Sequence, residues 1–264
     1  MKLNGADLFV LDTGGNGAPI VFAHGLLWSS RMFAPQIAAL RGQYRCIAFD
    51  FRGQGQSEVT ASGYDMDTLA DDAAALIEGL RIAPVHFVGL SMGGFVGMRL
   101  AARRPELVRS LALLETAPDP EPRSNLPKYL ALTWAASLLG FKALAGQAMK
   151  PLFGRTFLRD PARAARRAEL RQELVANDRV GAVRALKGVF GRKGVEDELG
   201  RIRAPTLVVT GDEDISVPVA RAMRAVERIA GARFVGIPRA GHTSTLEEPE
   251  AVTAALREFI GSVS

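Results

Sequence analysis

The sequence predicts an α/β fold: a mostly parallel, doubly wound sheet with an inserted helical cap. Short apolar runs of strand length alternate with longer stretches of helical periodicity over residues 19–114, and this alternation resumes over 204–260. Residues 117–200 instead show helical patterns broken by prolines and no convincing strand. Apolar strands separated by helices are typical of parallel sheets covered on both faces. We therefore expect a core domain at residues 1–116 and 201–264 and a helical cap subdomain at 117–200.

The first elements are strands. Residues 6–12 alternate weakly, and a glycine-rich turn separates them from the apolar run at 19–23, which predicts a hairpin with a buried second strand. Ser30 is then expected to cap a helix at residues 31–40. The apolar run at 45–50 predicts the next buried strand.

The later elements continue the alternation of strands and helices. Apolar residues at helical spacing, with acids near the start, predict an amphipathic helix over 66–80. A buried strand at 85–90 leads directly into a helix. The remaining predicted elements are a strand at 108–114, a strand at 204–211, a helix at 218–230, a strand at 232–237 and a last helix at 249–260.

Between the strand at 85–90 and its helix lies a Gly-x-Ser-x-Gly sequence, formed by Gly89, Ser91 and Gly93. So sharp a turn requires a positive φ at the serine and small residues beside it, because a Cβ there would collide with the neighbouring helix or strand. The serine hydroxyl is then held at a helix N-terminus, where backbone N–H groups favour negative charge. We interpret Ser91 as a nucleophile.

A nucleophilic serine needs a base to remove its proton and an acid to orient that base. The chain has three histidines. His86 lies within the strand that enters the turn, and His24 ends a strand beside a glycine, so we expect both to be structural. His242 lies in a glycine-containing loop between the last strand and the last helix, without apolar periodicity around it. We assign it as the general base.

The orienting carboxylate is expected in the loop after the strand at 206–210. This loop offers Asp212, Glu213 and Asp214. The spacing Gly-x-x-Asp, followed by Val-Pro, favours Asp214, and Asp212 remains the alternative. Glu115, directly after an earlier strand, is a further and less favoured alternative. The chain order serine, acid, histidine is the order that this strand–turn–helix serine requires.

Composition is that of an ordinary globular protein, with 48% hydrophobic and 23% charged residues. The net charge of +5 arises in residues 117–200, which hold 15 Lys and Arg against 9 Asp and Glu. These basic residues lie at helical spacing rather than in one run with aromatics, so no nucleic-acid partner is expected. Cys46 is the single cysteine, lies in an apolar run and is expected to be buried. No run resembles a signal peptide or is long enough to span a bilayer, so we expect a cytoplasmic protein without a membrane partner, monomeric or homodimeric.

Taken together, these motifs resemble the α/β-hydrolase fold superfamily, in the group of cap-bearing serine esterases, lactonases and non-metal haloperoxidases. The resemblance covers nearly the whole chain outside the cap. Its segments, in chain order, are His24-Gly25, Asp50 to Ser57, Gly89 to Gly94, Gly211 to Asp214 with Pro218, and Gly241-His242.

The resemblance implies an oxyanion hole made by the backbone N–H groups of Leu26 and Met92. It also implies two-step acyl transfer, in which Ser91 attacks an ester carbonyl, His242 moves the protons and water releases the acid. A serine at this turn argues against the dehalogenases and epoxide hydrolases of the fold, which place Asp there. The sequence shows no clustered metal ligands, so neither a metal nor another cofactor is expected.

The predicted substrate is a small-molecule carboxylic ester or lactone, including acylated lactones, bound in an apolar acyl pocket. The residues expected to form that pocket are Trp28, Met32, Phe33, Met92, Phe95, Trp134, Leu138, Phe153 and Phe157. Two alternatives use the same triad. One is carbon–carbon bond hydrolysis of ring-cleavage products, although the glycine-rich loop expected after His-Gly is replaced here by Leu26-Leu27-Trp28. The other is perhydrolysis of the haloperoxidase type, and a ligand sensor on a hydrolase fold is the non-enzymatic alternative.

Overall fold

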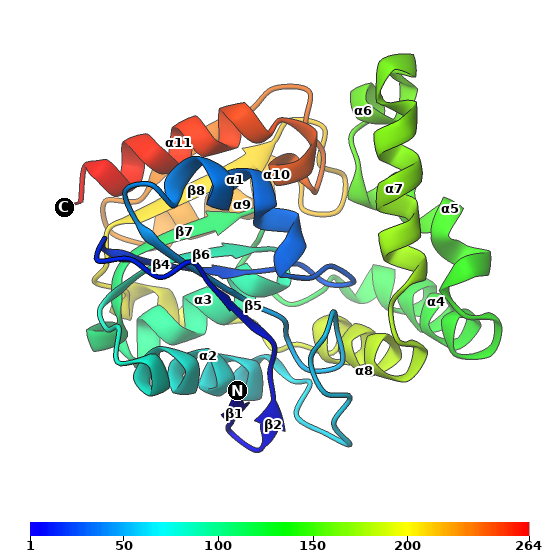
Figure 1. Ribbon diagram of the computed structural model, residues 1–264. Coiled ribbons are helices and arrows are strands. Elements are labelled where there is room, and N and C mark those ends of the chain that lie inside the picture. The colour runs from blue at the N-terminus through cyan, green and yellow to red at the C-terminus, as the bar shows by residue number, and fades with distance from the viewer. Residues whose placement is uncertain (264) are drawn as a thin grey trace.

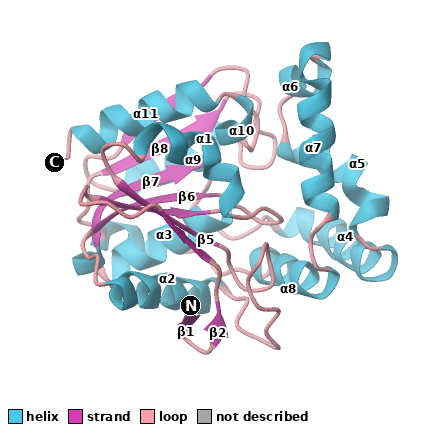
Figure 2. Ribbon diagram, in the orientation of Figure 1, coloured by secondary structure: helices cyan, strands magenta, loops and turns pink. Residues whose placement is uncertain are grey.

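The computed structural model describes residues 1–263 and contains a seven-stranded sheet with helices on both faces (Figures 1 and 2). The strand order is β3-β5-β4-β6-β7-β8-β9, and all neighbours are parallel except β3 and β5. The strands are β3 (Val10–Asp12), β4 (Pro19–Ala23), β5 (Arg45–Phe49), β6 (Val85–Leu90), β7 (Val108–Leu114), β8 (Thr206–Gly211) and β9 (Arg233–Ile237). A separate antiparallel pair, β1 (Lys2–Leu3) and β2 (Ala6–Asp7), lies near the N-terminus. The predicted fold class is confirmed.

Two groups of helices cover the sheet. One face packs against α1 (Ala34–Leu40), α10 (Ser244–Glu247) and α11 (Pro249–Gly261), and the other packs against α2 (Met66–Leu80), α3 (Met92–Arg103) and α9 (Val219–Arg228). The strands alternate between these two cores: in β4, Val21 and Ala23 face one side, whereas Ile20 and Phe22 face the other. Because both faces are buried, each central strand is a continuous apolar run rather than an alternating one.

The insertion between β7 and β8 is helical. Residues 115–205 contain no strand, and they hold α4 (Leu126–Leu139), α5 (Phe141–Leu152), α6 (Arg155–Arg159), α7 (Ala164–Val175) and α8 (Arg179–Phe190). In Figure 1 these helices, which we call the cap, gather to the right of the sheet. Their buried residues are continuous with the core under α1 and α11. Among residues 1–263, no helix has the length and apolar character needed to cross a membrane.

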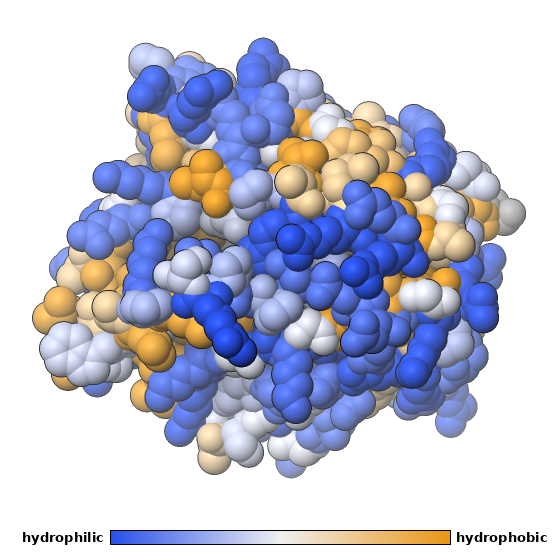
Figure 3. Space-filling view, turned by 180° about the vertical axis from the view of Figure 1, so that it is seen from behind, coloured by the Kyte–Doolittle hydropathy of each residue, from blue (hydrophilic) through white to orange (hydrophobic). Residues whose placement is uncertain are grey.

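The hydropathy of the surface is that of an ordinary globular protein, and the cysteine is buried as predicted. The face in Figure 3 is mainly hydrophilic, with apolar groups in patches. Cys46 is buried in the core, where desolvation raises the pKa of its thiol to about 11.

Two local predictions are wrong. β3 does not form a hairpin with β4, because β5 and β6 occupy both edges of β4 and leave β3 to pair antiparallel with β5. Long-range parallel pairing of a central strand thus outweighs the local turn. Ser30 does not cap a helix: it lies inside a short 3₁₀ turn, and its N–H donates to Asp50 Oδ1 at 2.6 Å. Helix α1 begins four residues later, at Ala34, with Pro35 in its first turn.

Candidate active site

Ser91 occupies the sharp turn between β6 and α3 with φ 50° and ψ −107°. The positive φ predicted for it is confirmed. A Cβ on Gly89 would lie 2.3 Å from the carbonyl oxygen of Gly93, and one on Gly93 would lie 2.0 Å from that of Ala23. Both distances are far below van der Waals contact, so only glycine fits on either side of the serine. The N–H of Ser91 donates to the carbonyl of Leu114 at 2.8 Å, which fixes the turn to the neighbouring strand.

Three side chains from separate loops form a hydrogen-bonded series at this turn. His242 Nε2 lies 2.9 Å from Ser91 Oγ, and His242 Nδ1 lies 2.8 Å from Asp214 Oδ2. The other carboxylate oxygen of Asp214 accepts the backbone N–H groups of Ser216 at 2.8 Å and Val217 at 3.0 Å. With Asp214 ionised, Nδ1–H donates to it, and Nε2 is left free to accept the serine proton. All three side chains of this series are buried.

The remaining candidates for base and acid lie elsewhere. The ring of His24 is bonded on both sides: Nδ1 lies 2.7 Å from the carbonyl of Gly25, and Nε2 accepts the N–H of Phe51 at 2.9 Å. Burial lowers the pKa of His24, which keeps it a neutral brace for its loop. Asp212 accepts the N–H of Arg239 at 2.7 Å rather than contacting the histidine of the series.

His86 and Glu115 are likewise buried inside the fold. His86 Nδ1 lies 2.8 Å from Ser110 Oγ, and desolvation lowers the pKa of His86 to about 4. Glu115 is fully buried, with no hydrogen bond to His242 among the described residues. Burial raises the pKa of Glu115 well above its usual value, and the nearby charge of Asp214 adds to this.

Two amides are expected to form an oxyanion hole: Leu26 lines the same cavity as Ser91, and Met92 directly follows the serine. Within residues 1–263, neither the N–H of Leu26 nor that of Met92 has a hydrogen-bond acceptor. Met92 begins α3, where a helical N–H has no intrahelical partner. Gln54 braces the same region, because its Oε1 accepts the N–H of Leu27 at 2.7 Å and its Nε2 lies 3.8 Å from Met92 Sδ.

Glu247 holds the loop that carries His242. Its buried carboxylate accepts the N–H groups of Gly241 at 3.0 Å and Thr243 at 3.2 Å, one on each side of the histidine. It also accepts the N–H of Gly154, in the cap, at 2.8 Å. Burial raises the pKa of Glu247 to about 7, although these hydrogen bonds oppose the shift. The position of the histidine therefore depends on a buried acid outside the hydrogen-bonded series.

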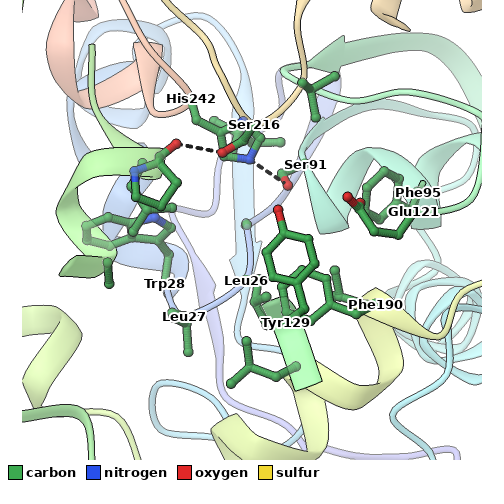
Figure 4. Close-up of a pocket in the computed structure, with 18 of the residues that line it drawn as sticks. Leu26, Leu27, Trp28, Ser91, Phe95, Glu121, Tyr129, Phe190, Ser216 and His242 are labelled. Atoms are coloured by element: carbon green, nitrogen blue, oxygen red, sulfur yellow. Dashed lines mark hydrogen bonds between the residues drawn. The ribbon is translucent and has the colours of Figure 1, made fainter. Parts of the chain in front are cut away.

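The cap is tied to the same loops at the end of α5. Ser216, two residues beyond the acid of the series, donates its hydroxyl to the carbonyl of Pro151 at 2.7 Å, as Figure 4 shows. Thr243, next to the histidine, donates its hydroxyl to the carbonyl of Leu152 at 2.9 Å. This part of the cap thus has a fixed position relative to the acid and the base.

Between the cap and the sheet, a cavity of about 120 Å³ lies beside Ser91 and His242 (Figure 4). Its wall is mostly apolar. It is lined by Gly25, Leu26, Leu27, Trp28, Leu90, Ser91, Phe95, Glu121, Tyr129, Leu132, Ala148, Pro151, Leu152, Leu186, Val189, Phe190, Arg192, Ser216, Val217 and His242.

One ion pair interrupts the apolar wall. The guanidinium of Arg192 lies 4.0 Å from the ring centre of Phe95, and its Nη1 lies 3.4 Å from Glu121 Oε2. Burial lowers the pKa of Arg192 to about 10. The positive charge of Arg192 offsets the negative charge of Glu121, so this part of the cavity wall is polar without a large net charge.

The predicted pocket requires correction. Trp28 and Phe95 line the cavity, but Met32, Phe33 and Met92 are packed in the core instead. Met32 and Phe33 follow the loop that lines the cavity, and the 3₁₀ turn directs them inward against α1 and the sheet.

The cap residues proposed for the pocket also lie elsewhere. Phe153 and Phe157 stack on each other, with ring centres 4.9 Å apart, behind Trp28. Trp134 and Leu138 point outward and are 68% and 56% exposed. They lie on the opposite side of α4 from Tyr129 and Leu132, which line the cavity. Because α4 is apolar on every side, its sequence does not indicate which side faces the site.

Most of the cavity-lining cap residues were missed from the sequence. A helical spacing relates them: Tyr129 and Leu132 on α4, and Leu186 and Phe190 on α8. This spacing identifies a face, but the choice between neighbouring faces depends on the packing of the cap. The ion pair of Glu121 and Arg192 joins residues distant in the chain and leaves no local sequence signal.

Comparisons with known proteins agree with this architecture. Residues 18–249 match the family described as the alpha/beta hydrolase fold. The chain is 30% identical over 273 residues to BpoC of Mycobacterium tuberculosis, for which a non-heme bromoperoxidase activity has been proposed, and the match covers 96% of this chain and 97% of BpoC. 

Two solved structures are similar over nearly their whole length. The enol-lactonase from Burkholderia xenovorans LB400 has a TM-score of 0.91 and 30% identity, covering 99% of both chains. A thermophilic esterase from Thermogutta terrifontis has a TM-score of 0.90 and 28% identity, covering 98% of this chain and 94% of its own. Since the family match spans most of the sequence, the chain belongs to the alpha/beta hydrolase fold family.

Proposed function

We propose that this protein is a serine hydrolase that cleaves small, uncharged carboxylic esters or lactones through an acyl-enzyme. The observation that most directly supports the proposal is the series Asp214–His242–Ser91, whose serine faces an apolar cavity. A nucleophile, a base within hydrogen-bond reach and a carboxylate that orients the base are the three groups that acyl transfer requires.

In the proposed first step, Ser91 Oγ attacks the carbonyl carbon while His242 Nε2 takes the hydroxyl proton. The N–H groups of Leu26 and Met92 stabilise the oxyanion, and the imidazolium then gives its proton to the leaving alkoxide. In the second step, His242 takes a proton from water as the water attacks the acyl carbon. The imidazolium then returns that proton to Ser91 Oγ as the ester bond to the serine breaks, which releases the acid and regenerates the enzyme. Asp214 stays ionised throughout and keeps the imidazole in the productive tautomer.

The size of the cavity favours a substrate with a small acyl group. A cavity of roughly 150 Å³ holds a benzene molecule, so the 120 Å³ observed here has room for about five heavy atoms. Its mostly apolar wall suits an uncharged substrate better than an ionic one. The solved enol-lactonase and esterase support the same reaction class.

The proposal is tested by hydrolysis of p-nitrophenyl esters of increasing acyl length, alongside simple and acylated lactones. The wild-type protein is expected to turn over many times on short esters or on lactones. Ser91→Ala should lose activity by about 10⁴-fold or more, because the nucleophile is absent. Activity that survives in Ser91→Ala would refute the nucleophile.

The same panel separates the alternatives. A ligand sensor would release about one equivalent of product and then stop. A carbon–carbon bond hydrolase would act on ring-cleavage diketones and leave the esters intact. A perhydrolase would show its main turnover only with peroxide and a carboxylic acid, and bromination assays would detect it.

A further inference from the structure

Tyr129 presents an unpaired hydroxyl to the cavity. It lies on the cap helix α4, and its ring stacks on that of Phe190 with ring centres 3.8 Å apart and an angle of 10° between the planes. Figure 4 shows the hydroxyl pointing toward Ser91. Within residues 1–263, this hydroxyl forms no hydrogen bond with the protein. The ring is therefore held in place while its polar end is left for another molecule.

The charges around Tyr129 keep it a donor. Burial raises the pKa of its phenol, and the carboxylate of Glu121 raises it further. Arg192 and Arg221 act in the opposite direction, and Asp214 adds a smaller upward effect. The phenol therefore retains its proton at neutral pH and can donate a hydrogen bond.

A donor in an apolar cavity discriminates between substrates. A plain hydrocarbon chain would strip water from the hydroxyl without replacing its hydrogen bond, which disfavours binding. A chain of the same shape that carries an ether or carbonyl oxygen would restore that bond. Sites built to hydrogen-bond a substrate reject analogues that lack the partner much more strongly than apolar pockets reject a missing methylene.

We propose that Tyr129 is a specificity-determining residue that donates a hydrogen bond to a second oxygen of the substrate, close to the scissile carbonyl. The preferred substrates are then carboxylic esters or lactones that carry an ether, ketone or amide oxygen in addition to the ester group. This inference rests on the proposed reaction at Ser91 and specifies its substrate class.

The test compares pairs of esters in which one oxygen replaces one methylene. Ethyl methoxyacetate and ethyl butanoate differ in this way in the acyl part, and 2-methoxyethyl acetate and butyl acetate differ in the alcohol part. For each pair, kcat/KM is measured with the wild-type protein and with Tyr129→Phe, which keeps the stacked ring and removes only the hydroxyl. The oxygen-to-methylene ratio is expected to fall about tenfold in Tyr129→Phe for one pair, which also shows which side of the substrate carries the oxygen.

The ratio is independent of how much enzyme is folded, since both esters are assayed on one preparation, and it cancels the intrinsic reactivity of each ester. Leu132→Ala is the matched control, because Leu132 lines the same cavity from the same helix without a polar group. It should change both members of a pair by the same factor. Ratios unchanged within about twofold in both pairs, or changed equally by Leu132→Ala, would overturn the role of Tyr129. Ser91→Ala separates the two levels: if it remains active, the proposed reaction fails, whereas unchanged ratios with an inactive Ser91→Ala overturn only the inference.

Discussion

Replacing Asp214 by Asn tests the orientation of His242. The Asn side-chain oxygen can still accept the N–H groups of Ser216 and Val217, so the loop should keep its shape. The amide nitrogen, however, would now face His242 Nδ1 as a donor at the 2.8 Å contact. Nδ1 must then be unprotonated, and the proton moves to Nε2, where it points at Ser91 instead of accepting from it.

The expected loss is large because the base is in the wrong tautomer. The equivalent change in a serine protease triad lowers kcat by about 10⁴, which corresponds to about 5 kcal/mol in the activation barrier. The assay is steady-state hydrolysis of p-nitrophenyl acetate, with thermal unfolding measured on the same sample to show that the fold is retained.

Asp212→Asn is the matched control, since within residues 1–263 the Asp212 side chain accepts one hydrogen bond, from the backbone N–H of Arg239, and does not contact His242. It should keep activity within about threefold of wild type. The assignment of the acid would be wrong if Asp214→Asn kept more than a tenth of the wild-type activity. It would also be wrong if Asp212→Asn lost more activity than Asp214→Asn. Glu115 would then be the next residue to test.

Four further outcomes are expected. Gly93→Ala should abolish folding or cost several kcal/mol in the free energy of unfolding, because its Cβ would lie 2.0 Å from the Ala23 carbonyl oxygen. Gly146→Ala should instead stabilise α5 by about 0.5–1 kcal/mol in urea unfolding, because among the described residues nothing beyond its chain neighbours and the adjacent helix backbone lies within 4 Å of the added Cβ. The raised pKa of Glu247, about 7, favours the neutral acid in the folded state, so its contribution to stability is complete below about pH 4.5 and is lost as the pH rises through 7. Urea unfolding is measured from pH 4.5 to 8. The free energy of unfolding of the wild type should fall by up to about 3 kcal/mol relative to that of Glu247→Gln, and parallel pH dependences of the two free energies would contradict this. On p-nitrophenyl esters, kcat/KM should be highest for acetyl to butyryl groups and fall at least about tenfold by octanoyl, and a maximum at octanoyl would show that the cavity is not the acyl site. Trp134→Ala should leave kcat/KM within about twofold of wild type, because that side chain is 68% exposed. A larger loss would indicate that Trp134 does contact the substrate.

The sequence alone determined the α/β class, most of the strands and helices, and the positive φ at Ser91. These features depend on local chemistry: apolar runs of strand length, helical spacing, and glycines where a Cβ would overlap the backbone. The sequence also singled out His242, since only three histidines exist and two lie inside or at the end of predicted strands.

Only the tertiary structure decided which partners meet. β3 joins β5 rather than β4, because the central strand β4 takes neighbours on both edges. The spacing in the sequence favoured Asp214 but left Asp212 open. In the structure Asp214 reaches His242, since the N–H groups of the loop direct its carboxylate, whereas Asp212 accepts from Arg239. The cavity required the cap to be packed: α4 is apolar on every side, so periodicity could not show that Tyr129 faces Ser91 while Trp134 faces solvent. Local patterns specify backbone and burial, whereas the site depends on contacts between residues far apart in the chain.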